Sequence, residues 1–328
     1  MTDVIGEHVF RQFLASLEPA MRLAGPVRDG KIVEFREGAP EDFVLDDSVS
    51  YKAPKEFYFP QVERLITFQD GEAESEPEPR PVAVTGARPC DLEALRVMRA
   101  VFLNGRYKDP FFEQRQARGL VIGLACDARK PGCFCDALGL DMKFSDFCDI
   151  LLERARGEGA FKVTHLSGRG AEALAKFPGT ADVKPAPARV GVTRGRALGL
   201  DLGRGEKEFF GLIDWEDAAA ACQGCGMCTY ICPTCHCFEF RDVTENGVTG
   251  RYRCWDSCMF PRFTLHASGH NPRASRAARY RQRVLHKYLY VAQNTGHIAC
   301  TGCGRCVRSC PVGINIKSIV ESLTEAEK

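Results

Sequence analysis

Two cysteine runs with the same spacing constrain this chain more than any other feature of its sequence. Both have the form Cys-x2-Cys-x2-Cys-x3-Cys-Pro, and they end at Pro233 and Pro311. The chain has 17 cysteines among 328 residues, and its first residues lack the basic start and apolar run of a secretory signal. We therefore expect a cytoplasmic protein in a reducing compartment, where a disulfide framework is not formed. The cysteines are expected to bind metal.

The spacing of the two runs predicts two [4Fe–4S] clusters. Thiols at intervals of three residues can wrap a tight turn around one cubane, and the glycines between them let the backbone bend. In the bacterial two-cluster run, the fourth cysteine binds the other cluster. We therefore expect exchanged ligands. The first cluster is expected on Cys222, Cys225, Cys228 and Cys310, and the second on Cys300, Cys303, Cys306 and Cys232.

Zinc is the alternative metal for these runs. Structural zinc sites usually pair two Cys-x2-4-Cys units around one tetrahedral ion. Two runs of three evenly spaced cysteines, each with a fourth before proline, do not divide in that way. Two clusters with exchanged ligands in one small domain instead indicate transfer of electrons.

The insert between the runs is long for a compact ferredoxin. A hairpin is predicted over residues 239–252, with its turn at Asn246-Gly247, and a helix over residues 273–292, begun by Asn271 and Pro272. Residues 206–328 are thus expected to form an α-helical two-cluster ferredoxin domain. Five arginines of that helix predict a solvated or ion-paired face, with docking to an acidic partner or stabilisation of the anionic clusters as alternatives; they are Arg273, Arg276, Arg279, Arg281 and Arg283. Four further cysteines stay unassigned, as reserve ligands or buried thiols: Cys235, Cys237, Cys254 and Cys258.

The first 200 residues have a different pattern. Residues 82–86 and 120–124 are apolar runs of strand length, and residues 92–102 between them have helical spacing. This order predicts an α/β domain over residues 1–200 with a partly parallel sheet. An acidic, proline-rich exposed loop is expected at residues 71–81, and a linker at residues 194–205.

Four cysteines follow the two predicted strands. Parallel strands end at the same edge of a sheet, where α/β folds place their ligands. The set therefore predicts a third iron–sulfur cluster, with zinc or a group of inert buried thiols as alternatives. Its members are Cys90, Cys126, Cys133 and Cys135, whereas Cys148 lies on an apolar stretch and is expected in the core.

Several stretches of this chain resemble a known family. They are Pro54-Lys55-Glu56-Phe57-Tyr58-Phe59-Pro60, Arg88-Pro89-Cys90-Asp91, Cys133-Phe134-Cys135, Cys232-Pro233-Thr234-Cys235-His236-Cys237-Phe238, Trp255-Asp256-Ser257-Cys258 and Gly269-His270-Asn271. In combination they resemble the beta (iron–sulfur) subunits of cytoplasmic sulfhydrogenases, the NAD(P)-linked [NiFe] hydrogenases. A related subunit of anaerobic sulfite reductase is similar. The resemblance runs from about residue 20 to the end of the chain.

The resemblance implies a non-catalytic electron-transfer subunit. Its expected partners are a flavin subunit that handles NAD(P)H and the small and large subunits of a [NiFe] hydrogenase. A relay to a sulfite reductase or another reductase is one alternative, and an enzyme that binds substrate at an open iron of the N-terminal cluster is another.

The remaining features of the sequence agree with a subunit role. The chain has no Gly-x-Gly-x-x-Gly or Walker-type motif, so it predicts no nucleotide site of its own. Lys and Arg (44) nearly balance Asp and Glu (43), which gives no support for a nucleic-acid partner. No apolar stretch is long enough to predict insertion into a membrane.

Overall fold

The structure is a computed structural model that describes residues 4–77, 79–155, 159–180, 183–185, 200 and 205–326. The chain divides into two compact units. Unit 1 consists of Met1–Tyr58, Pro79–Gly195 and Thr301–Cys303, and unit 2 of Phe59–Glu78, Arg196–Cys300 and Gly304–Lys328. The linker predicted at residues 194–205 lies outside the described residues, apart from Leu200 and Gly205.

Unit 1 is built on a seven-stranded mixed sheet. Its strands are β1 (Val4–Gly6), β2 (Arg22–Asp29), β3 (Ile32–Glu37), β6 (Val82–Ala87), β7 (Leu120–Leu124), β8 (Ile150–Arg154) and β9 (Ala160–His165). Its helices are α1 (Glu7–Leu17), α2 (Pro89–Leu103), α3 (Pro110–Arg118) and α4 (Gly168–Ala175), with short 3-10 turns at Pro40–Asp42, Pro54–Phe57, Asp136–Leu138 and Pro178–Thr180. The strand order is β1-β9-β8-β7-β6-β2-β3. The four central strands, β8, β7, β6 and β2, pair in parallel. The outer strands β1, β9 and β3 pair antiparallel.

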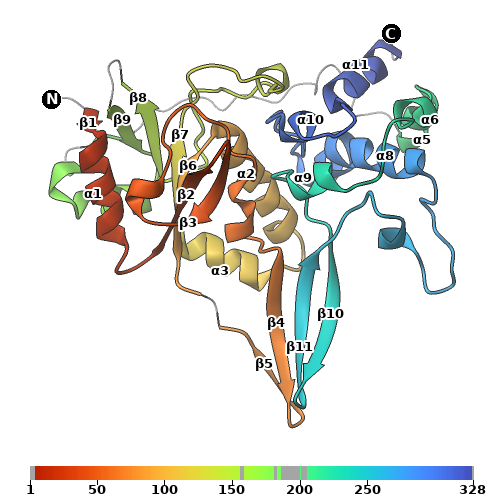
Figure 1. Cartoon of the computed structure of the whole chain (residues 1–328), viewed down its shortest axis with the longest axis horizontal. Coiled ribbons are helices and arrows are strands. Elements are labelled where there is room, and N and C mark those ends of the chain that lie inside the picture. The colour runs from red at the N-terminus through yellow and green to blue at the C-terminus, as the bar shows by residue number, and fades with distance from the viewer. Residues whose placement is uncertain are drawn as a thin grey trace. The chain divides into compact units, whose positions relative to one another are not determined.

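Helices cover both faces of this sheet. Ile122 of β7 packs on one face in a core that includes Phe10 and Phe13 of α1. Gly123, the next residue, faces the other way, where an added Cβ would lie 2.9 Å from Leu92 Cδ1 of α2. Figure 1 shows α1 and α2 on opposite sides of the sheet. The predicted α/β layer with a partly parallel sheet is thereby confirmed.

Unit 2 combines short helices with a four-stranded antiparallel sheet. Its strands are β4 (Val62–Gln69), β5 (Glu72–Ser75), β10 (Phe238–Glu245) and β11 (Val248–Trp255). Its helical elements are α5 (Glu206–Gly211), α6 (Trp215–Ala218), α7 (Met227–Tyr230), α8 (Arg276–Leu285), a π-helix (His286–Tyr290), α9 (Val291–Thr295), α10 (Arg305–Arg308) and α11 (Ile316–Ala326), with a 3-10 turn at Pro261–Thr264. The strand order is β10-β11-β4-β5, and the long strands form an arm of unit 2 (Figure 1).

The arm confirms the predicted hairpin and corrects the predicted loop beside it. Asn246 and Gly247 join β10 to β11 with φ angles of 51° and 81°. Two left-handed residues in a two-residue turn match the twist of a hairpin. Within the predicted acidic loop, Glu72–Ser75 pairs with β4 as strand β5, although all four of its side chains are exposed.

The helix predicted over residues 273–292 begins later and is not regular throughout. The helix starts at Arg276. Its N-cap is Ser275, whose side chain accepts a hydrogen bond from the Ala278 amide, and not the predicted Asn271. The helical path then passes through the π-helix His286–Tyr290 and ends at Thr295.

Candidate metal centres

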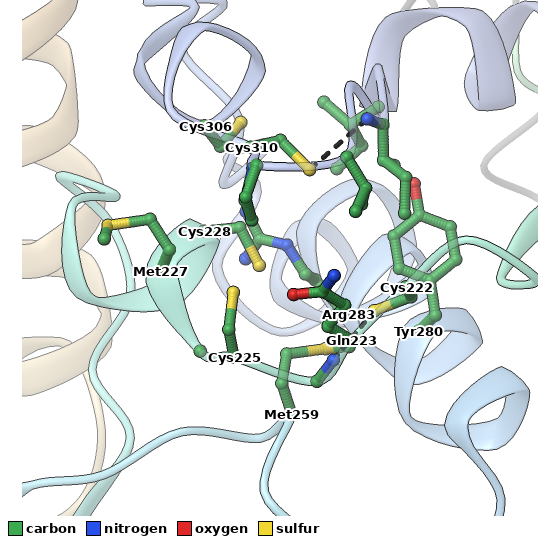
Figure 2. Close-up of a pocket in the computed structure, with 16 residues that line it drawn as sticks. Cys222, Gln223, Cys225, Met227, Cys228, Met259, Tyr280, Arg283, Cys306 and Cys310 are labelled. Carbon is green, nitrogen blue, oxygen red and sulfur yellow. Dashed lines mark hydrogen bonds between the residues drawn. The ribbon is translucent and has the colours of Figure 1, made fainter.

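One pocket of unit 2 is surrounded by cysteines of both runs. Cys222, Cys225 and Cys228 line it from the first run, and Cys310 lines it from the second. The space measures about 530 Å³, counting the part open to solvent. Figure 2 shows the sulfur atoms of these cysteines around it. The four thiols that the sequence predicts for the first cluster thus line the same space.

The backbone at these runs has the bends that the glycines were expected to allow. Gly224 and Gly226 have φ angles of 67° and 77°, and Gly302 and Gly304 have φ angles of 63° and 71°. Residues with a Cβ rarely adopt this conformation. Each pair of positive φ values turns a run sharply between its first and third cysteine.

Backbone amides already point at two of the pocket's sulfur atoms. The Gly224 amide donates to Cys222 Sγ at 3.4 Å, and the Ile314 amide donates to Cys310 Sγ at 3.3 Å. Amide hydrogen bonds of this kind stabilise thiolates and tune the potential of a bound cluster. The geometry suits anionic, sulfur-rich ligation.

The cysteines predicted for the second cluster are distributed differently. Cys232, Cys300 and Cys306 belong to unit 2, and Cys303 belongs to unit 1. Cys232 is buried, and its Sγ lies 3.3 Å from Thr234 Oγ1. Cys306 also lines the pocket of the first set.

Two buried cations lie beside these thiols. Arg283 and Lys287 are each only 3% exposed, and neither forms a salt bridge with a carboxylate in the part of the chain that the structure describes. Arg283 Nη1 donates to Cys235 Sγ at 3.4 Å, and Lys287 Nζ donates to Thr234 Oγ1 at 2.9 Å. A buried charge is costly unless a charge of opposite sign lies near it. The negative charge available to this pair is that of the cysteines.

The electrostatics of Lys287 depend on the same thiols. Burial disfavours its charged form, but the neighbouring Cys232 and Cys235 favour that form more strongly, so the pKa of Lys287 is raised. Around the first set, burial raises the pKa of Cys228, and the Arg283 guanidinium opposes that effect. An anionic cubane with thiolate ligands would supply the countercharge that both cations lack.

The five arginines expected on one helix face are separated in the structure. Arg279 and Arg283 are buried, whereas Arg276 is exposed and donates to the Cys222 carbonyl at 2.8 Å. Arg281 stacks on the Phe210 ring, with 3.7 Å between Cζ and the ring centroid. Lys287 was missed, because nothing in the sequence distinguishes a buried lysine from a solvated one in a helix rich in basic residues.

The four unassigned cysteines occupy two kinds of position. Cys235 forms a hydrogen bond with Cys232, and Cys237 forms one with Cys258. Cys258 is buried, while Cys254 lies half-buried in β11. Thiol pairing places Cys235 next to a predicted ligand.

Two of the N-terminal cysteines follow strands that the sequence predicted. Strands β6 and β7 pair in parallel, so the chain leaves both at the same edge, shortly before Cys90 and Cys126. Burial, together with the neighbouring Cys133 and Cys126, raises the pKa of Cys135 to about 12. Cys90 is buried in the first turn of α2.

Within unit 1, this cysteine loop packs on residues 301–303. The Phe134 amide donates to the Gly302 carbonyl at 2.8 Å, and Cys133 Sγ lies 3.3 Å from the Cys303 carbonyl oxygen. A Cβ on Gly302 would come within 2.6 Å of the Cys135 backbone. Cys148 is buried and donates to the Ser145 carbonyl at 3.4 Å, as expected for a core thiol.

The four cysteines of the first set surround a space rather than one point. Among the residues described by the structure, no three His, Cys, Asp or Glu side chains lie close enough to hold one metal ion. Zinc needs four ligands within about 2.3 Å of one point. A cubane carries its thiolates on four separate iron atoms and therefore suits ligands that surround a space.

The comparisons with known proteins concern the family of the chain and its dicluster region. Residues 221–314 match the family model of the 4Fe-4S dicluster domain, a range that includes all eight cysteines of the two runs. Over 96% of its length the chain is 28% identical to the Sulfhydrogenase 2 subunit beta of Pyrococcus furiosus, which is itself covered to 96%. The resemblance to sulfhydrogenase beta subunits is confirmed. No solved structure matches the chain.

The similarity to the sulfhydrogenase subunit extends well beyond the dicluster domain. Because it covers 96% of both chains, it includes unit 1 and its cysteine loop. The beta subunit is by its name one part of a larger enzyme. No helix among the described residues is long and apolar enough to cross a membrane.

Proposed function

We propose that this chain is a non-catalytic electron-relay subunit of a hydrogenase complex. It passes electrons between a flavin subunit that handles NAD(P)H and the subunits of a [NiFe] hydrogenase. When bound, [4Fe–4S] clusters supply one-electron steps over a potential range that the protein tunes. The chain itself holds the clusters, shields them and neutralises part of their charge.

The pocket of unit 2 supports this proposal most strongly. Cys222, Cys225, Cys228 and Cys310 line it, and Arg283 beside it lacks a carboxylate partner among the described residues. We assign these cysteines to the first cluster and Cys300, Cys303, Cys306 and Cys232 to the second, within a two-cluster ferredoxin domain of the α-helical type.

A third cluster is proposed in unit 1. Cys126 and Cys133 are near enough to Cys135 to affect its pKa, and Cys90 lies in the first turn of the helix that follows the neighbouring strand. Cys133 contacts Cys303, a proposed ligand of the second cluster. A cluster at this loop would add a third electron carrier to the chain.

The proposal is tested first by metal analysis of the full chain. The chain is reconstituted with iron and sulfide without oxygen, and iron, sulfide and zinc are counted. About twelve irons are expected from three cubanes. About eight irons would remove the third cluster, and bound zinc without sulfide would overturn the relay.

The partners are tested on the native complex. An affinity tag on this chain should retrieve a complex that contains nickel and flavin. Siroheme in place of nickel would assign the chain to a sulfite reductase instead. Turnover of NAD(P)H or sulfite by the isolated chain would contradict a non-catalytic role.

A further inference from the structure

The helical segment from α8 through the π-helix presents two tyrosines to the two cysteine sets. Tyr280 lies in α8 and lines the pocket formed by Cys222, Cys225, Cys228 and Cys310, as Figure 2 shows. Tyr288 lies in the π-helix and interacts with the thiol of Cys300. One continuous helical path thus brings one phenol to each set.

Both phenols are buried. Tyr280 is 3% exposed and Tyr288 is 1% exposed. Within the described part of the chain, neither hydroxyl oxygen has a well-formed hydrogen bond. A buried hydroxyl without an acceptor destabilises the fold. Two buried phenols on one helix, each beside thiols, indicate sulfur acceptors in the loaded protein.

The residues that line the first pocket offer the Tyr280 hydroxyl few hydrogen-bond acceptors other than sulfur. Apart from Gln223, Tyr280 and Arg283, the side chains around it are thiols, methionines, a proline and aliphatic residues. Arg283 Nη2 also lacks a hydrogen-bond partner among the described residues. Tyr280 Oη and Arg283 Nη2 are thus two donors, one helical turn apart, at a space lined by sulfur.

The second set has a corresponding pair. Lys287 directly precedes Tyr288, and its Nζ donates to Thr234 Oγ1 and to the Ala299 carbonyl at 2.9 and 3.4 Å. Each cysteine set therefore has one phenol and one buried cation from the same helical path. The pairs occur in opposite order along the chain, tyrosine first in one and lysine first in the other.

We propose that Tyr280 and Tyr288 each donate a hydrogen bond to a sulfur atom of one cluster, Tyr280 to the first and Tyr288 to the second, and so raise their reduction potentials separately. This inference rests on the proposed function, because it requires both clusters. A donor at sulfur stabilises the more negative, reduced state, so its loss lowers the potential. Tyr280 lines a pocket with all four cysteines of the first set and Tyr288 interacts with Cys300 of the second, so the larger effect of each loss is expected on a different cluster.

The test uses the full chain with reconstituted clusters and a redox titration followed by EPR. Cys225→Ser and Cys300→Ser chains, each altered in one set, assign the midpoints of the first and second clusters and separate them from that of the third. Tyr280→Phe is expected to move the first midpoint to a more negative value, and Tyr288→Phe is expected to move the second. The two variants are matched controls for each other, since each removes one oxygen atom from the same helical path.

Unchanged midpoints at full iron content would overturn the inference, as would both variants moving the same cluster. If a phenylalanine variant loads less iron, a site-specific fluorotyrosine at the same position keeps the donor and strengthens it. That chain is expected to show a midpoint moved in the positive direction, and no shift would again overturn the inference. Absence of clusters from the unaltered chain would instead defeat the proposed function.

Discussion

Arg253 and Glu63 form a buried ion pair between strands that lie 190 residues apart in the sequence. Arg253 Nε donates to Glu63 Oε1 at 2.6 Å, and the two side chains are 3% and 5% exposed. The guanidinium also lies 5.0 Å from the centroid of the Phe59 ring. This pair fastens β4 to β11 and so attaches residues 59–78 to unit 2.

Removing one partner of this pair should destabilise unit 2. Arg253→Met leaves the Glu63 carboxylate buried without its cation, and the expected loss is about 3–5 kcal/mol in the free energy of unfolding. The measurement is chemical denaturation of the reconstituted chain. The double variant Arg253→Met with Glu63→Leu should recover much of the loss, because no buried charge is left. A single variant as stable as the unaltered chain would contradict the prediction.

The turn of the β10–β11 hairpin should tolerate no Cβ at its second residue. Gly247→Ala is expected to cost about 1–2 kcal/mol, because φ at this position is 81°. Gly211→Ala at the end of α5 is the matched control, since both glycines are exposed and have no atom within 4 Å of an added Cβ. Thermal melting of the two variants should separate them. Equal melting temperatures for the two variants would show that the left-handed conformation of Gly247 does not limit stability.

Serine in place of a proposed ligand should remove or alter one cluster and leave the other. Cys225→Ser is expected to change the iron count or the EPR signal of the first cluster only. Cys254→Ser, in β11, should leave both unchanged, because this thiol is not assigned to a cluster. A loss of iron from the Cys254 variant would require a new assignment of ligands in unit 2.

Replacing the buried Lys287 should raise the melting temperature of the chain without clusters and lower the potential of the second cluster in the loaded chain. Without clusters, Lys287→Met removes a buried charge that lacks a carboxylate partner among the described residues, so the melting temperature should rise. With clusters loaded, the same change removes the countercharge near Cys232 and Cys300, so the potential of the second cluster should fall. Melting curves and redox titrations of both forms provide the measurement. A melting temperature lowered in both forms would mean that Lys287 is chiefly a packing residue.

The spacing of apolar residues and of cysteines in the sequence was sufficient to predict much of this architecture. Strands β6 and β7 and helix α2 could be predicted because apolar runs and helical periodicity alternate cleanly there. The Asn246-Gly247 turn could be predicted because these two residues adopt left-handed angles easily. The shared pocket of Cys222 and Cys310 followed from the repeated cysteine run, whose chemistry demands an exchange between runs.

Long-range pairing was hidden from the sequence. Strand β5 is fully exposed and acidic, so its pairing with β4 leaves no periodic pattern. Strand β2 contains Gly25 and Pro26, which local propensity places outside strands. The burial of Arg283 and Lys287 depends on tertiary packing around the thiols, and a helix rich in basic residues gives no sign of which of them face inward.

The pocket that Cys310 shares with Cys222, Cys225 and Cys228 has a consequence for biosynthesis. A fragment cut anywhere between the two runs would lack one wall of this pocket, so neither half is expected to assemble the proposed first cluster. On the ribosome, the wall closes only after residue 310 of 328 has emerged. Insertion of iron at the proposed first site is therefore expected only after both cysteine runs have been synthesised.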